Sequence, residues 1–471
     1  MIPLRTYDGK KIAVFGLARS GLAAIEALLE GGASVVAWDD SETQRCEAAE
    51  LGALISNLYD EDWSQIDACV LSPGIPLTHP APHAIVLKAQ ENKVEIVGDL
   101  ELLEKERLSI SKPPALVCLT GTNGKSTTTS LVGHILQEAG VPSEVGGNIG
   151  EPALALKQFR NGRQTYVLEV SSYQLDLTPS LKPNIAVLLN ISPDHLDRHG
   201  GMDGYVSSKR KIFANQGTGD TAIVSVDDPY SAEICTDLSR AGGVTVVPIS
   251  VGKTLSKGVF VVDGILFDGF ETPSVEVLDL HECPNLRGEH NWQNAAAAYA
   301  VARSQNLARD SVIRGLKSFK GLAHRMENVG QLNQVKFVND SKATNVDAAR
   351  HALSSFDDIY WIVGGRSKTN SLSELEPLMA RVKHAYLIGE SADAFSHALA
   401  GKTDNVISGD LASAVVTAYR DAARENLTDP VVLLSPACAS FDQFKDFEAR
   451  GDHFRKIVEE LINQESGGAA A

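Results

Sequence analysis

The chain has 471 residues and a net charge of −17, and 43% of its residues are hydrophobic and 22% charged. This composition is typical of globular proteins, and at ~150 residues per domain the length predicts about three domains. The acidic balance argues against a general nucleic-acid binder or a membrane-surface protein, because both need a basic face. The sequence shows no signal peptide and no membrane-spanning run, and its six cysteines lack metal-binding spacing. We therefore expect a reduced, cytoplasmic protein without membrane insertion.

The first hundred residues predict a parallel α/β sheet. A strand at Lys11–Phe15 leads through a turn at Gly16–Gly21 into a helix at Leu22–Leu29, and a second strand at Ser34–Trp38 ends at Asp39. A strand, a glycine turn and a helix, followed by an acidic residue about 20 positions on, form the Rossmann arrangement.

The carboxyl edge of this sheet is a candidate ligand site. Ala18 replaces the second glycine of the Rossmann fingerprint, and its Cβ would crowd a pyrophosphate, so the sequence disfavours NAD. A further strand, Ala68–Leu71, ends in a proline–glycine turn at the edge where open α/β sheets bind ligands. We expect a nucleotide-diphosphate substrate there, although these glycines and prolines could be purely structural. The predicted contacts are Arg19, Ser20, Asp39 and Gly74.

A phosphate-binding turn follows a linker that we place near 100–114. Four apolar residues, Leu116–Leu119, predict a buried strand, and a helical pattern begins after the glycine-rich turn. In such a turn, backbone N–H groups converge on phosphate oxygens at a helix N-terminus. Lys125 would reach the β- and γ-phosphates, and Ser126 or Thr127 would hold Mg²⁺. An ordinary turn with a solvated lysine is the alternative, and the flanking strand and helix favour nucleotide binding.

Two further strands in the middle of the chain also end in polar residues. The strand Thr165–Val170 carries Glu169 near its end, where a carboxylate beside a phosphate-binding turn usually binds Mg²⁺. The strand Ile185–Leu189 leads to His195, which shares this edge with Lys125. We interpret His195 as functional, with a structural histidine as the alternative.

The rest of the middle region is less informative. The basic run Lys209–Lys211 by itself predicts a solvated helix face. Asn291 and Asn294 lie three residues apart at the start of an alanine-rich helix and share one face. They fit an adenine or ribose contact, with helix capping as the alternative for Asn291. A hairpin over 258–270 precedes this helix, and we end the region at residue 321.

Polar loops follow three predicted strands in the last third. These strands are Val335–Val338, Ile359–Val363 and Val431–Leu434. Because the carboxyl ends of parallel strands meet at one edge of a sheet, we expect the loops to lie together. Lys342, Lys368 and Ser440 could then hold a dianionic small molecule, although each alone fits an ordinary surface residue.

With these residues identified, the chain resembles the Mur ligases along nearly its whole length. The segment Thr120–Thr127, Thr-Gly-Thr-Asn-Gly-Lys-Ser-Thr, is similar to the short phosphate loop of that superfamily. Three segments resemble its D-glutamate-adding branch, namely Gly16–Gly21, Asn339–Asn345 and Leu434–Phe444. The resemblance implies ATP-dependent ligation of D-glutamate to UDP-N-acetylmuramoyl-L-alanine in peptidoglycan precursor synthesis, through an acyl phosphate and a tetrahedral intermediate.

The resemblance also implies roles for individual residues. Catalysis would involve Lys125, Glu169, His195, Lys209 and Arg325. ATP would be contacted by Gly121, Thr122, Asn123, Gly124, Lys125, Ser126, Thr127, Asn291, Asn294, His324, Arg325 and Asp340. The UDP-substrate would be bound by Ser20, Asp39, Gly74, Asn148 and His195, and D-glutamate by Lys342, Thr344, Lys368, Ser440 and Phe447. Two Mg²⁺ ions would be held by Ser126, Glu169, His195 and Lys209, the last as a carbamate formed with CO₂, which replaces the solvated interpretation of this lysine.

The implied architecture is α/β with three domains. They are a Rossmann-like UDP-substrate domain at 1–104, a P-loop ATP-binding domain with a mostly parallel sheet at 105–321, and a Rossmann-like amino-acid domain at 322–471. We expect a monomer whose third domain closes during the reaction. Ala18 and the Asp40–Ser41 pair depart from the family pattern at the uridine end.

Three other functions fit parts of the chain. Another Mur-type ligase or a folylpolyglutamate synthetase would differ only in the amino acid or the acceptor. An NAD-dependent oxidoreductase could use the first βαβ unit, and a non-catalytic regulator could use the phosphate-binding turn alone.

Overall fold

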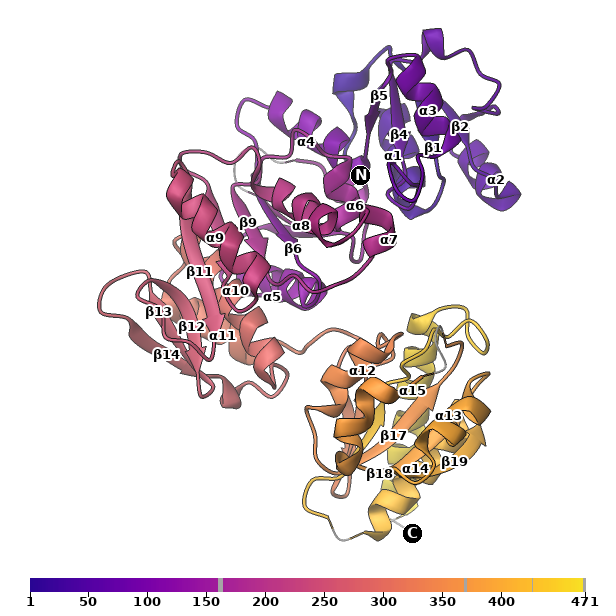
Figure 1. Ribbon diagram of the computed structural model, residues 1–471, viewed down its shortest axis with the longest axis vertical. Coiled ribbons are helices and arrows are strands. Elements are labelled where there is room, and N and C mark those ends of the chain that lie inside the picture. The colour runs from indigo at the N-terminus through magenta and orange to yellow at the C-terminus, as the bar shows by residue number, and fades with distance from the viewer. Residues whose placement is uncertain (160–163, 368–370, 426, 469–471) are drawn as a thin grey trace. The chain divides into compact units, whose positions relative to one another are not determined.

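The computed structural model describes residues 1–159, 164–367, 371–425 and 427–468, and the strands in this part of the chain form three sheets (Figure 1). Helices flank the sheets, and most neighbouring strands run parallel. The predicted α/β class with three sheets is therefore confirmed. The chain divides into two compact units, Met1–Cys283 with Asn291–Phe319, and Pro284–His290 with Lys320–Ala471.

The first sheet has five parallel strands in the order β3-β2-β1-β4-β5. Its strands are β1 (Lys11–Phe15), β2 (Ser34–Trp38), β3 (Leu54–Ile55), β4 (Ala68–Leu71) and β5 (Glu95–Val97). Its helices are η1 (Arg5–Tyr7), α1 (Arg19–Glu30), α2 (Glu42–Glu50), η2 (Trp63–Gln65) and α3 (Ala84–Glu91). β1, β2 and β4 have the predicted bounds, because continuous apolar runs mark strands that are covered on both faces. β3 and β5 are too short to give such a run.

The second sheet has nine strands in the order β14-β13-β12-β11-β10-β9-β6-β8-β7. Its strands are β6 (Ala115–Thr120), β7 (Ser143–Gly147), β8 (Thr165–Glu169), β9 (Ile185–Leu188), β10 (Thr221–Ser225), β11 (Thr245–Val251), β12 (Gly258–Val262), β13 (Ile265–Gly269) and β14 (Val275–Asp279). Among the described strands of this sheet, only the pairs β12–β13 and β13–β14 are antiparallel, and the first of them confirms the predicted hairpin.

The helices around the second sheet carry several of the predicted site residues. They are α4 (Asp99–Ser109), α5 (Lys125–Glu138), η3 (Ala153–Ala155), α6 (Ser172–Asp176), α7 (Leu196–His199), α8 (Met202–Arg210), η4 (Lys211–Phe213), α9 (Pro229–Ala241), η5 (Leu280–Glu282), α10 (Glu289–Ser304) and α11 (Arg309–Ser318). α5 begins at the lysine of the predicted phosphate loop, as expected.

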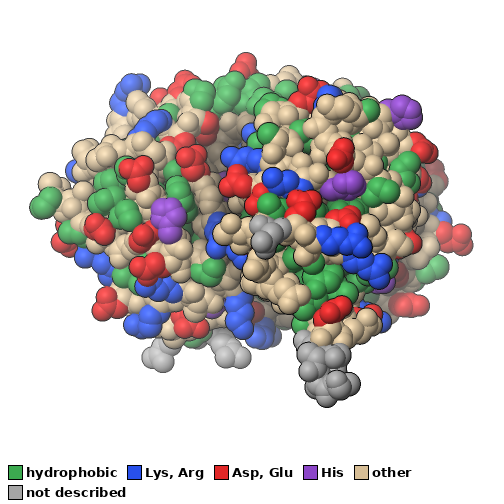
Figure 2. Space-filling model, turned by 90° about the horizontal axis from the view of Figure 1, so that it is seen from below, with side chains coloured by type: hydrophobic (Ala, Val, Ile, Leu, Met, Phe, Trp, Pro, Cys, Tyr) green, Lys and Arg blue, Asp and Glu red, His purple; other side chains and the backbone are tan. Residues whose placement is uncertain are grey.

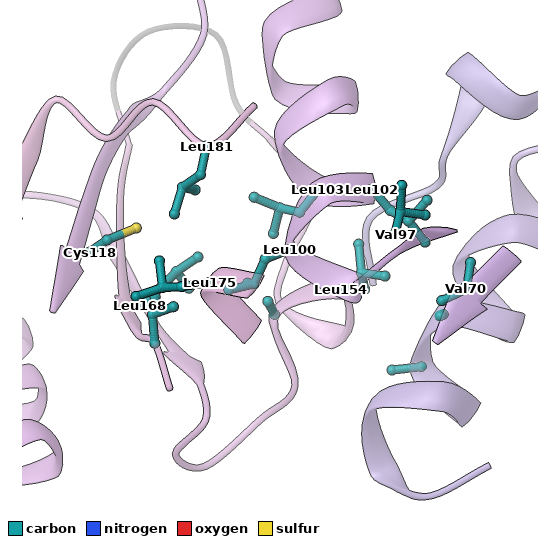
Figure 3. Packing of buried hydrophobic residues seen from close by; sticks show 14 of the residues in the cluster. Val70, Val97, Leu100, Leu102, Leu103, Cys118, Leu154, Leu168, Leu175 and Leu181 are labelled. Carbon is teal, nitrogen blue, oxygen red and sulfur yellow. The ribbon is translucent and has the colours of Figure 1, made fainter. Parts of the chain in front are cut away.

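The linker predicted near 100–114 is wrong for most of its length, because α4 covers Asp99–Ser109. Figure 3 shows why: Leu100, Leu102 and Leu103 of α4 are fully buried in a core that also contains Val97 of the first sheet and Cys118 of the second. Apolar burial on this scale favours a packed helix over an extended connection. The domain boundaries after residues 104 and 321 stay predictions, and the first falls inside α4.

The described residues of the third sheet form six strands in the order β15-β16-β20-β17-β18-β19, of which only β15 is antiparallel to its neighbour. Its strands are β15 (Glu327–Leu332), β16 (Val335–Asn339), β17 (Ile359–Gly364), β18 (Val382–Ile388), β19 (Asp404–Gly409) and β20 (Val431–Leu434). Its helices are α12 (Val346–Leu353), η6 (Ser373–Arg381), α13 (Ala392–Leu399), α14 (Leu411–Arg424) and α15 (Phe447–Gly468). The central position of β20 brings its polar loop beside those of β16 and β17, as predicted.

None of the helices in the described part of the chain is long and apolar enough to cross a membrane. On the face drawn in Figure 2, acidic and basic side chains are interspersed and not gathered by sign.

Candidate active site

The turn between β6 and α5 has the geometry of a phosphate-binding loop. Gly124 precedes α5 in the left-handed region with φ 82°, and a Cβ there would lie 2.3 Å from Oδ1 of Asn294. Lys125 donates from Nζ to the carbonyl oxygens of Gly121 and Thr122, both at 2.9 Å. The lysine therefore lies along the loop, where it can exchange a backbone oxygen for a phosphate oxygen.

Asn291 and Asn294 lie on α10 behind this loop. Both side chains are buried, and Nδ2 of Asn294 donates to Oδ1 of Asn291 at 3.0 Å. The hydroxyl of Thr128 donates to Oδ1 of Asn294 at 3.0 Å. Asn294 thus supports the phosphate loop from behind, and the adenine or ribose contacts of both asparagines stay predictions.

Glu169 ends β8 beside the phosphate loop, and its side chain is 2% exposed. Its Oε1 accepts a hydrogen bond from Nδ2 of Asn148 at 2.8 Å. Its Oε2 is buried and has no hydrogen-bond partner among the described residues. A buried carboxylate oxygen without a donor is costly, so this atom is suited to bind a cation.

Lys209 on α8 is 1% exposed, so the solvated interpretation of the basic run is wrong for this residue. Its Nζ donates to the carbonyl oxygen of Gly121 at 2.8 Å and lies 4.7 Å from the ring centre of Tyr205. Burial and, after it, the charge of Lys125 hold the pKa of Lys209 well below its ordinary value. A larger fraction of this amine is therefore neutral and nucleophilic than in a solvated lysine.

His195 stands immediately before α7 in the left-handed region, with φ 52°. Its Nε2 lies 3.4 Å from Oδ2 of Asp194, and its ring centre lies 5.1 Å from that of Tyr173. Partial burial lowers the pKa of His195, which favours the neutral imidazole that metals bind.

A cavity of about 490 Å³ within the first unit brings many of these residues together. The predicted site residues that line it are Arg19, Ser20, Gly74, Lys125, Asn148, His195 and Lys209. They come from turns of the first sheet and, around the second, from the start of α5, the residue after β7, the residue before α7, and α8. The volume lies in the range of about 300–1,000 Å³ that small-molecule sites occupy.

Asp39 does not line this cavity. Its carboxylate accepts hydrogen bonds from the backbone N–H groups of Leu17 at 2.7 Å and Ser41 at 2.8 Å. These contacts hold the turn after β1 in place, and a uridine contact for Asp39 stays a prediction.

Several residues that line the cavity were not predicted from the sequence, among them Asp99, Tyr173, Gln174 and Tyr205. Asp99 is 3% exposed, and burial raises its pKa to about 6. It follows β5 at the carboxyl edge of the first sheet, so the rule used for the other strands would have found it had this three-residue strand been recognised. The tyrosines gave no such signal, because single aromatic residues on helices usually belong to a core.

In the second unit, the loop after β16 is fixed by a buried carboxyl. Asp340 is 5% exposed and accepts hydrogen bonds from the hydroxyl of Ser435 at 2.9 Å and the backbone N–H of Met326 at 3.2 Å. Burial raises the pKa of Asp340 to about 7. His324 also packs here, with one ring nitrogen 3.1 Å from Nδ2 of Asn339. The ATP contacts predicted for His324, Arg325 and Asp340 are not tested by this geometry.

The residues predicted to bind D-glutamate lie partly together in the second unit. The Lys342 Nζ lies 4.0 Å from the ring centre of Phe447, and the adjacent Ser341 donates its hydroxyl to the carbonyl oxygen of Phe447 at 2.8 Å. Ser440 is 2% exposed and follows β20 at the same sheet edge. Thr344 lies two residues after Lys342 in the loop that follows β16, and Lys368 lies outside the described residues.

Two protein-family models match parts of the chain. Residues 119–302 match the Mur ligase middle domain, and residues 324–438 match the Mur ligase glutamate ligase domain. Proteins named UDP-N-acetylmuramoylalanine–D-glutamate ligase are similar over the full length. The relative from Caulobacter vibrioides (strain NA1000 / CB15N) is 53% identical over 100% of both chains, and that from Phenylobacterium zucineum (strain HLK1) is 51% identical over 100% of both.

Solved structures of lower identity share the fold. MurF of Acinetobacter baumannii superposes with a TM-score of 0.59 at 18% identity, covering 92% of this chain and 91% of that one. The UDP-N-acetylmuramate-alanine ligase of Thermotoga maritima has a TM-score of 0.56 at 16% identity, covering 96% and 99%.

Proposed function

This chain belongs to the Mur ligase family, and on that premise we propose that it joins D-glutamate to UDP-N-acetylmuramoyl-L-alanine at the expense of ATP. Full-length relatives at about half identity carry the name of this activity. The choice of D-glutamate over other amino acids rests on them. The cytoplasmic location and the monomeric state expected from the sequence stay predictions.

One observation in the structure carries the proposal. The cavity of the first unit contains both Lys125 of the phosphate loop and residues of the first-sheet turns, including Ser20 and Gly74. A ligand that spans it could place a diphosphate at the turns and a carboxylate near the phosphate loop. That is what a UDP-linked acceptor of a phosphoryl group requires.

The residues present fit a divalent cation beside the phosphate loop. The buried Oε2 of Glu169 has no hydrogen-bond partner in the described part of the chain, and carboxylate oxygens are preferred Mg²⁺ ligands. Glu169 does not belong to a cluster of three or more His, Cys, Asp or Glu side chains placed to bind a metal, because the described residues contain none. In the proposed site the hydroxyl of Ser126 and the phosphates of ATP would complete the coordination, and His195 and Lys209 would serve a second ion. Bound Mg²⁺ would neutralise charge that develops on the phosphates.

The burial of Lys209 supports its predicted modification. A carbamate forms when a neutral amine attacks CO₂, so that an N–C bond is made and one proton is released. The lowered pKa of this lysine supplies the neutral amine. The product would be an anionic oxygen ligand in place of a cation beside Lys125.

The first chemical step is phosphoryl transfer. The alanine carboxylate of the acceptor attacks the γ-phosphorus of ATP, a P–O bond forms, and the bond to ADP breaks. Lys125 and the backbone N–H groups of the phosphate loop would hold the transferring group, since positioning and charge neutralisation dominate this reaction.

The second step makes the amide. The amine of D-glutamate attacks the carbonyl carbon of the acyl phosphate, giving a tetrahedral intermediate that expels phosphate and loses the proton of the amine. Lys342 and Ser440, with Lys368 beyond the described residues, would bind the two carboxylates of D-glutamate. Water must be excluded, because it would hydrolyse the acyl phosphate.

The test is release of phosphate from ATP in the presence of UDP-N-acetylmuramoyl-L-alanine. We expect release with D-glutamate, and not with L-glutamate, L-lysine or meso-diaminopimelate. Release with one of the other amino acids would instead assign the chain to another branch of the family.

A pair of lysine variants tests the role of the phosphate loop. Lys125→Ala should abolish the D-glutamate-dependent release, whereas Lys157→Ala, at a lysine side chain that is 74% exposed, should retain it. Retained release in Lys125→Ala would contradict the proposed role, and loss of activity in both variants would point to damaged folding.

A further inference from the structure

His199, a residue that the proposed function does not use, lies between two tyrosines of the cavity wall. It is the last residue of α7, which packs against α8 in the first unit, and α8 also packs against α6 (Figure 1). Its ring stacks on that of Tyr173, with centres 5.3 Å apart and planes at 12°. It also contacts the ring of Tyr205, with centres 5.4 Å apart. We call Tyr173, His199 and Tyr205 the aromatic bridge.

Each outer ring of the aromatic bridge contacts one of the two side chains assigned to the second metal ion. The ring centre of Tyr173 lies 5.1 Å from that of His195, and the Nζ of Lys209 lies 4.7 Å from the ring centre of Tyr205. The bridge thus connects His195 to Lys209 through three side chains in contact. The hydroxyl of Tyr205 further lies 3.1 Å from Oγ1 of Thr122 in the phosphate loop.

Polar contacts hold His199 in the middle of the bridge. Its side chain is 3% exposed, its Nε2 lies 3.0 Å from the hydroxyl of Ser172, and its Nδ1 lies 3.4 Å from Oδ2 of Asp176. The other oxygen of Asp176 accepts from Lys211 at 2.7 Å. A ring that is buried and held at both nitrogens has one orientation, so it can fix the rings packed on it.

We propose that His199 is a positioning residue that, through Tyr173 and Tyr205, holds His195 and Lys209 at the spacing needed to bind a divalent cation. The inference rests on the proposed function. It assigns to His199 no contact with substrate or metal, only the alignment of two side chains, one immediately before α7 and the other on α8. Packing of the ring carries this alignment, and the bonds to Ser172 and Asp176 orient the ring.

The test measures metal binding without turnover. Electron paramagnetic resonance would follow the titration of free Mn²⁺ with the ADP-bound protein, for the wild type, His199→Ala and His199→Phe. We expect His199→Ala to raise the dissociation constant of Mn²⁺ about 10-fold or more, the cost typical of losing a group that orients metal ligands. His199→Phe keeps a ring between the tyrosines and should stay within about 3-fold of the wild type.

A second readout reports Lys209 directly. The ¹³C NMR signal of a lysine carbamate, formed with ¹³C-bicarbonate, should be weaker in His199→Ala than in the wild type. The matched control is His134→Ala, because His134 also contacts an aromatic ring, Phe319, and a hydroxyl, Ser318 at 2.8 Å, but lies outside the bridge. This control should bind Mn²⁺ as the wild type does.

The outcomes separate this inference from the proposed function. Unchanged Mn²⁺ binding in His199→Ala, or binding as weak in His199→Phe as in His199→Ala, overturns the inference. If His199→Ala does not fold, Tyr173→Leu tests the inference in its place. The variant lacks the ring that contacts His195, so it should bind Mn²⁺ more weakly than the wild type, and unchanged binding would overturn the inference. A wild-type protein that binds Mn²⁺ but releases no phosphate with D-glutamate contradicts the proposed function instead.

Discussion

Side chains predicted to contact ligands differ in whether their polar atoms already have hydrogen-bond partners within the protein. Asn294 has its amide bonded to Asn291 on its own helix and to Thr128 on α5, so both its nitrogen and its oxygen already have partners within the protein. Glu169 shares one oxygen with Asn148 and leaves the other buried without a donor in the described part of the chain. The buried oxygen of Glu169 indicates a ligand more strongly than the amide of Asn294 does. A buried oxygen without a hydrogen-bond donor costs free energy until a cation or a donor binds to it.

Removing the charge of Glu169 tests this interpretation. Glu169→Gln should lower D-glutamate-dependent phosphate release on the order of 100-fold, with the loss reduced at high Mg²⁺, because an amide oxygen is a weaker metal ligand than a carboxylate. Glu144→Gln is the control, since this carboxylate is paired with the exposed Lys157 at 3.3 Å. Equal rates for wild type and Glu169→Gln at every Mg²⁺ concentration would remove Glu169 from the metal site.

Asp99 predicts a pH dependence of stability. Burial raises the pKa of its carboxyl from 3.8 to about 6, so between these values the folded state binds more protons than the unfolded state. Stability therefore falls as pH rises from about 4 to about 6, by up to about 3 kcal/mol from this group. Asp99→Asn should remove this loss, so its stability advantage over the wild type should grow over that range and stay constant above it.

Urea unfolding from pH 4 to pH 8 would measure the effect. The exposed Glu91 on α3 offers the control, and Glu91→Gln should follow the wild type at every pH. If the free energy of unfolding changed with pH in the same way for Asp99→Asn and the wild type, burial would not destabilise the charged carboxylate of Asp99.

Strand–turn–helix elements position both ends of the cavity. In the first of them, α1 can approach β1 only because position 21 lacks a side chain: a Cβ on Gly21 would lie 2.0 Å from the carbonyl oxygen of Gly16. In the turn after β4, a Cβ on Gly74 would meet nothing within 4 Å, yet Gly74 lines the cavity. One glycine is therefore needed for packing, and the other leaves space where a ligand would lie.

The two glycines should respond differently to alanine. Gly21→Ala should lower the melting temperature by several degrees, because a backbone oxygen must move to admit the methyl group. Gly74→Ala should melt as the wild type does but raise KM for the UDP-substrate, since its methyl group would occupy ligand space. A lower melting temperature in Gly74→Ala, or an unchanged KM, would argue against a binding role for this turn.

The proposed reaction needs residues from both compact units of the chain. Lys125 belongs to the first unit, and Lys342 and Ser440 belong to the second. The proposed chemistry requires the acyl phosphate and the amine of D-glutamate to meet with water excluded, so we predict that substrates change the distribution of distances within the protein.

Solution X-ray scattering tests this prediction. The radius of gyration of the wild type should fall when a non-hydrolysable ATP analogue and UDP-N-acetylmuramoyl-L-alanine are added together. It should not fall when the same ligands are added to Lys125→Ala, or when buffer without ligands is added to the wild type. Identical scattering curves with and without ligands would contradict closure.

The sequence by itself predicted several of the strands, the glycine-rich turn after β6, the polar strand ends and the family, because these depend on local patterns of apolar, glycine and polar residues. It predicted that Lys125, Glu169 and His195 share a sheet edge, since parallel strands impose this. The tertiary structure alone decided how each side chain is satisfied: Lys209 bonds a carbonyl 88 residues away, and α4 is packed where we expected a linker. Burial and partners of this kind arise between segments distant in the chain, so no local pattern records them. The contacts of His199 and the burial of Asp99 are therefore known only from the folded structure.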